Sequence, residues 1–88
     1  MALNPSEEFT YRQQVMYEIE RELFNAQTRF PPFRSPHEGY AIIKEELDEL
    51  WELIKKNQGE SYTARREAIQ LAAMAARYVY DLGAEFDA

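Results

Sequence analysis

Two neighbouring segments fix where one helix of this chain ends and the next begins. Pro31-Pro32 follows a stretch of apolar residues at helical spacing, and a residue that precedes a proline avoids the α region. Directly after them, Ser35-Pro36-His37-Glu38 has the pattern of a capping box with proline at the first helical position. The linker between the two helices is therefore short and stiff, and we expect Phe30 and Phe33 to pack down on the helices.

Similar signals bound the other helices. Asn4-Pro5-Ser6-Glu7 predicts a helix start, and Asn57-Gln58-Gly59 predicts the end of the second helix. The third helix is expected to begin near Ser61 or Thr63 and to stop at Gly83. The sequence thus predicts an all-α fold, a single domain over residues 1–88 with three helices at about 5–29, 35–57 and 61–82, in a helical bundle completed by oligomerisation.

Length and composition exclude several classes of protein. A chain of 88 residues builds one domain with a marginal core, so burial against a second subunit is expected. With no Cys and one His, disulfide frameworks and Cys- or His-based zinc sites are excluded. A net charge of −6 argues against binding to DNA or RNA. With neither a signal-peptide pattern nor an apolar run near the roughly 20 residues of a membrane span, we expect a cytoplasmic protein that contacts no membrane.

The third predicted helix is apolar on two sides, which indicates burial on two sides. One side packs within the subunit and the other across an interface, so we expect a homo-oligomer, a dimer or a tetramer. The two apolar faces are Ile69, Ala72, Ala73, Ala76, Val79 and Tyr80 on one side, and Leu71, Ala75, Tyr78 and Leu82 on the other. The polar residues share a third sector with Met74: Arg66, Glu67, Gln70, Arg77 and Asp81. Within this sector Arg77 and Asp81 are expected to form a weak surface ion pair.

A carboxylate inside an apolar face of the second helix points to function. At about 100° per residue, Glu46 falls between Leu50 and Leu53, and Glu49 lies at the edge of the same arc. A carboxylate removed from water needs an Arg, a proton or a metal ion as partner. Two carboxylates at i and i+3 lie side by side and can both reach one hard cation.

These residues belong to a longer pattern. The stretch Phe30 to Trp51 (FPPFRSPHEGYAIIKEELDELW), followed by Glu67 to Ala76 (EAIQLAAMAA), resembles MazG-like proteins of the all-α nucleoside triphosphate pyrophosphohydrolase superfamily. The resemblance covers roughly residues 30–82 and is greatest to short, single-domain members found in phage and mobile elements. The family signature is Glu-Glu-x-x-Glu on one helix and Glu-x-x-Asp on the next. Its first half matches residues 45–49, and Glu67 begins the second half after 17 intervening residues.

The resemblance implies a magnesium site. By position, the metal ligands it implies are Glu46, Glu49, Glu67 and, where the family has Asp, Gln70. A Gln carbonyl oxygen can still ligate Mg²⁺ or Mn²⁺, but it brings no charge and cannot act as a general base. Glu45 joins the three glutamates as an implied catalytic residue, placed to reach a second ion or to orient a water. Glu38, on the same flank of the helix, is a weaker candidate to compensate for the missing charge.

The implied reaction is attack of water between the α- and β-phosphates of a nucleotide, which releases a nucleoside monophosphate and pyrophosphate. Carboxylates that hold Mg²⁺ supply charge neutralisation and a polarised water for such chemistry. Candidate phosphate contacts, chosen by charge, are Lys55, Arg66 and Arg77. Candidates for the apolar pocket of the base and sugar are Trp51, Tyr40 and Phe33.

Two alternatives stand beside this interpretation. Because Gln70 replaces an acid, the chain can also be a catalytically silent acidic helical module that keeps the fold and binds a protein or a small ligand. Within the superfamily, a phosphoribosyl-ATP pyrophosphatase is of similar size, although the flanking segments resemble the MazG-like group better.

Overall fold

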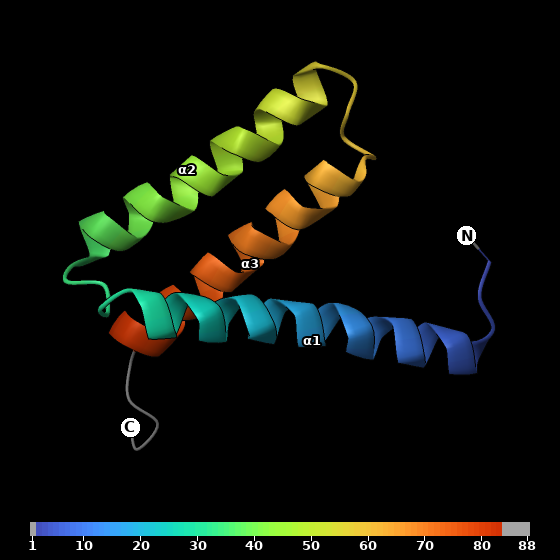
Figure 1. The fold of residues 1–88 in the computed structure, drawn as a ribbon, viewed down its shortest axis with the longest axis horizontal. Helices are drawn as coiled ribbons and strands as arrows, with labels where there is room; N and C mark the ends of the chain where they lie inside the picture. Colours follow the sequence, from blue (N-terminus) through green and yellow to red (C-terminus); the bar gives the residue numbers. More distant parts are fainter. Residues whose placement is uncertain (1, 84–88) are drawn as a thin grey trace.

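The computed structural model describes residues 2–83 and consists of three helices (Figure 1). Helix α1 spans Pro5–Arg29, α2 spans Pro36–Lys55 and α3 spans Tyr62–Leu82. No strand occurs in residues 2–83, so the all-α prediction is confirmed. Met1 and residues 84–88, which the predicted domain includes, lie outside the described part of the chain. Within that part, no helix has both the length and the apolar character needed to cross a membrane.

Each helix begins with a side-chain cap, as its sequence predicts. Asn4 and Glu7 form a reciprocal capping box at α1, and the Ser61 hydroxyl accepts a hydrogen bond from the Ala64 N–H at α3. The predicted box at α2 is wrong in its second half. The Ser35 hydroxyl accepts from the Glu38 N–H, but the Glu38 carboxylate turns to Arg34. There it accepts hydrogen bonds from both the backbone N–H and the guanidinium of Arg34, and the bonds from the guanidinium, which join two charged groups, are stronger than a bond from the Ser35 N–H would be.

Helix α3 lies against both of the other helices (Figure 1). Helices α2 and α3 run antiparallel, joined by a turn in which Asn57 adopts a left-handed φ of 59°. Helix α1 converges with α3 at their C-terminal ends. Further back along both helices, Arg65 donates two hydrogen bonds to the Glu18 carboxylate. The small core lies where the helices meet, with Ala26, Ala73 and Met74 at its centre and Ile19, Leu23, Ile42 and Ile43 packed around them.

The buried side of α3 includes Ala73 of a predicted apolar face and also two residues of the predicted polar sector. Met74 and Arg77 are buried, although the sequence places them in the polar sector. Val79 and Tyr80, which lie on one of the two predicted apolar faces, are 69% and 75% exposed in the single subunit, where a face that packs across an interface would be uncovered. Arg77 is buried because it finds a partner on the linker, where its guanidinium donates to the Pro31 carbonyl. Hydrophobic periodicity does not register such partners.

The linker packs closely only through its second ring. Phe33 is buried as expected, whereas Phe30 is more than half exposed, so that half of the linker prediction is wrong. The Phe33 N–H donates to the Asp81 carboxylate at 2.9 Å, and the Arg77 guanidinium donates to the Pro31 carbonyl at 2.8 Å. The predicted surface pair of Arg77 and Asp81 is therefore wrong in one respect, because both side chains are buried and tie the linker to α3.

Candidate metal centre

Three carboxylates from two helices converge on one point. Glu46 and Glu49 lie one turn apart on α2, and the antiparallel packing of α3 places Glu67 opposite them. One carboxylate oxygen of each residue lies within 4.8 Å of the others. The structure therefore brings together the three acidic residues that the resemblance to MazG-like proteins implies as ligands of one cation.

Two oxygens in this group have no hydrogen-bond partner within residues 2–83. Glu46 Oε2 and Glu67 Oε2 are both buried from solvent and accept no hydrogen bond from the described residues. A buried acceptor without a donor destabilises the fold by about 1–3 kcal/mol, and more when it carries charge. The site thus has a deficit of positive charge or of protons, which a divalent cation with oxygen ligands would remove.

The shifted pKa values reflect the same deficit. Burial, the negative charge of Glu49 and the nearby Glu67 raise the pKa of Glu46 from 4.5 to about 7. Contact with the Glu67 carboxyl group is the main cause that raises the pKa of Glu49, with burial second. Both shifts show that the cluster resists carrying its full negative charge without a cation.

Gln70, at the position where the resemblance implies Asp, contacts a fourth acid. Its Nε2 donates to Glu22 Oε2 of α1 at 3.5 Å. The sequence analysis did not select Glu22, although the signal that marks Glu46 is present there too. Glu22 lies one turn after Ile19 and one turn before Ala26, inside the apolar face of α1.

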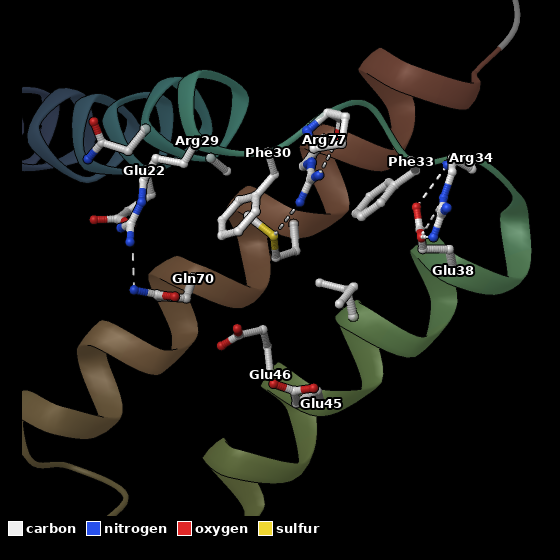
Figure 2. A pocket seen from close by; sticks show the side chains of 15 residues that line it. Glu22, Arg29, Phe30, Phe33, Arg34, Glu38, Glu45, Glu46, Gln70 and Arg77 are labelled. Carbon is white, nitrogen blue, oxygen red and sulfur yellow. Dashed lines mark hydrogen bonds and ion pairs between the residues drawn. The ribbon is translucent and has the colours of Figure 1, made fainter.

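An open cavity of about 640 Å³ lies beside this group and is lined by one of its three carboxylates, that of Glu46 (Figure 2). Glu45 and Glu46 line it from α2, and Glu22 lines it from α1. Aromatic and basic side chains form another part of its wall, with contributions from Phe30, Phe33, Arg29, Arg34 and Arg77. A cavity of this size is within the range that holds a small organic ligand.

The remaining predicted contacts are placed as follows. Arg77 lines the cavity, but its guanidinium already has partners within the protein. Its Nε lies 3.5 Å from Asp81 Oδ2, and its Nη2 donates a hydrogen bond to the Pro31 carbonyl. Glu38 also lines the cavity, and Arg34 lowers its pKa through hydrogen bonds. Of the aromatic candidates, Phe33 lines this cavity, whereas Tyr40 and Trp51 are exposed and do not.

Two predicted cationic contacts lie outside this cavity. Lys55 pairs with Glu52 at 2.6 Å and lies 5.8 Å from the ring centre of Trp51. Arg66 lines a separate cavity of about 200 Å³, whose wall Glu22 and Gln70 share. The structure therefore brings together three of the predicted acidic residues, Glu46, Glu49 and Glu67, and disperses the predicted basic ones.

Comparisons with protein-family models, curated proteins and solved structures found no significant match. The arrangement itself establishes a group of three acidic residues that could bind a metal ion beside an open cavity.

Proposed function

We propose that this protein is a Mg²⁺-dependent nucleoside triphosphate pyrophosphohydrolase that releases pyrophosphate from (deoxy)nucleoside triphosphates. The observation that carries the proposal is the pair of buried oxygens on Glu46 and Glu67, which have no hydrogen-bond partner in the described part of the chain and converge with Glu49 beside a cavity. The resemblance of residues 30–82 to MazG-like proteins supplies the reaction. Self-association, cytoplasmic location and a role in a mobile element belong to the same proposal.

The donor set fits a hard divalent cation. Carboxylate oxygens are the ligands that Mg²⁺ prefers, and an ion held by a few of them keeps positions for water and phosphate oxygens. Glu46, Glu49 and Glu67 would hold the ion. When bound, Mg²⁺ neutralises phosphate charge and polarises a water molecule. Glu45, which lines the cavity beside Glu46, is available to accept a hydrogen bond from a water or a substrate hydroxyl.

The proposal is tested by thermal unfolding of the parent and of Glu46→Gln against Mg²⁺ and Mn²⁺ concentration. A ligand that binds the native state raises the melting temperature by mass action. We therefore expect added metal to raise the melting temperature of the parent and to leave that of Glu46→Gln unchanged. Glu52→Gln, an exposed change on the same helix, is the control for lost charge. A panel of nucleotides is then assayed for released pyrophosphate.

Gln70 favours a second candidate, a silent module with the same fold that binds a protein or a small ligand. Its amide is engaged with Glu22 and cannot serve as a general base. This candidate would be supported over the enzyme if the melting temperature did not change with metal concentration and if neither nucleoside triphosphates nor phosphoribosyl-ATP were hydrolysed.

A further inference from the structure

We infer that Glu22 supplies, from α1, the negative charge that Gln70 lacks, and that the two side chains act as one unit of the cation site. The inference rests on the proposed metal centre. Gln70 lies one turn after Glu67 on α3, so it lies next to a proposed ligand. Its Nε2 donates to Glu22 Oε2, which links this position to a carboxylate on another helix.

The chemistry of an amide explains why the pair works as a unit. A Gln side chain has a donor end and an acceptor end. When the nitrogen is committed to Glu22, the carbonyl oxygen is left as the end that can face a cation. In Figure 2, Glu46 extends from α2 toward α3 and Gln70, and Glu22 lies across the cavity on α1.

The same contact explains why an acid at position 70 would be unfavourable here. Two carboxylates at this distance repel each other strongly in a partly buried site. The observed pair of Glu22 and Gln70 carries one negative charge and forms one hydrogen bond, whereas two acids would carry two charges and repel each other. The charge is thus moved from α3 to α1 rather than removed.

Three variants test this inference through metal-dependent thermal unfolding with Mn²⁺ alone. Glu22→Gln removes the charge and is expected to weaken the apparent Mn²⁺ affinity about tenfold or more, the effect typical of losing a group that supports metal ligands. Gln70→Glu is expected to lower the melting temperature without metal and to strengthen the response to Mn²⁺. The exchange Glu22→Gln/Gln70→Glu restores one charge and one hydrogen bond, and should return the affinity to within about threefold of the parent.

The control is Glu20→Gln, an exposed glutamate of α1 with the same change in net charge. If Glu22→Gln responds to Mn²⁺ like Glu20→Gln while Glu46→Gln loses the response, Glu22 is a structural contact and the inference is overturned. If the parent itself shows no Mn²⁺ response, the proposed metal centre fails and the inference fails with it.

Discussion

The guanidinium carbon of Arg77 lies 4.0 Å from the centre of the Phe33 ring, and both side chains are buried. A cation over an aromatic face is stabilised by the ring quadrupole, more so when it is desolvated. The same guanidinium binds the Pro31 carbonyl and faces Asp81, whose carboxylate accepts the Phe33 N–H. These contacts fix the linker between α1 and α2 against α3, and with it one wall of the cavity.

Removing the charge of Arg77 should therefore destabilise the fold. Arg77→Met keeps most of the side-chain volume but leaves the Asp81 carboxylate buried without its cation, which costs about 3–5 kcal/mol. Chemical denaturation at pH 7 measures the loss. Arg12→Met, an exposed change on α1, should stay within about 0.5 kcal/mol of the parent. Equal stabilities of the two variants would show that the linker does not depend on Arg77.

Gly39 allows α2 to approach α3 closely. A Cβ at this position would lie 2.6 Å from Cδ2 of Tyr78 and 3.3 Å from the Phe33 ring. Alanine improves helix propensity by about 1 kcal/mol, whereas overpacking costs about 1–3 kcal/mol. We expect Gly39→Ala to destabilise the fold by about 1 kcal/mol in denaturant unfolding. In a Tyr78→Leu background the clash is relieved, and the same substitution should become neutral or stabilising; a penalty that persists there would place the strain elsewhere.

Stability should fall as the pH rises through the range in which Glu46 titrates. The pKa of Glu46 is about 7 in the folded protein against 4.5 ordinarily. Between these values the folded state binds more protons than the unfolded state, so the free energy of unfolding decreases with rising pH. We expect this slope in melting temperatures measured with a chelator from pH 4.5 to 7.5, and a flatter profile for Glu46→Gln. Saturating Mg²⁺ should remove the loss at the upper end.

Glu18 provides a control of opposite sign. Hydrogen bonds from Arg65 lower the pKa of Glu18 to about 2, so its contribution is present above pH 4.5 and is lost as the pH falls toward 2. Glu18→Gln should alter the acid limb of the profile and leave the slope between pH 5 and 7 unchanged. A slope that changes equally in both variants would mean that Glu46 is not its source.

The predicted self-association can be tested on α2. Tyr40, Leu47, Trp51 and Ile54 share one face of this helix and are each between 44% and 62% exposed. If a second copy covers them, Leu47→Lys/Trp51→Ser should dissociate the oligomer at micromolar concentration in light scattering. Glu60→Lys, an exposed change before α3, should not. A parent protein that scatters as a monomer would contradict the prediction.

The sequence by itself determined the local features of this protein. Asn4, Ser35 and Ser61 cap the helices that their positions predict, because a cap depends on backbone groups within a few residues. Glu46 also stands where the helical period places it, partly buried and facing α3. Helical spacing was therefore sufficient to pair Glu46 with Glu49, whereas Glu67, which converges with them, was implied by the resemblance to MazG-like proteins.

Only the tertiary structure decided which distant groups meet. The burial of Arg77 depends on the path of the linker, and the contact between Glu22 and Gln70 depends on the angle at which α1 crosses α3. Neither the path of the linker nor the crossing angle can be predicted from the periodicity of one helix. Periodicity shows how apolar one side of a helix is, but not which charged groups of other elements lie against it. For this reason the sequence predicted a weak surface pair of Arg77 and Asp81, and the structure shows both side chains buried where the linker meets α3.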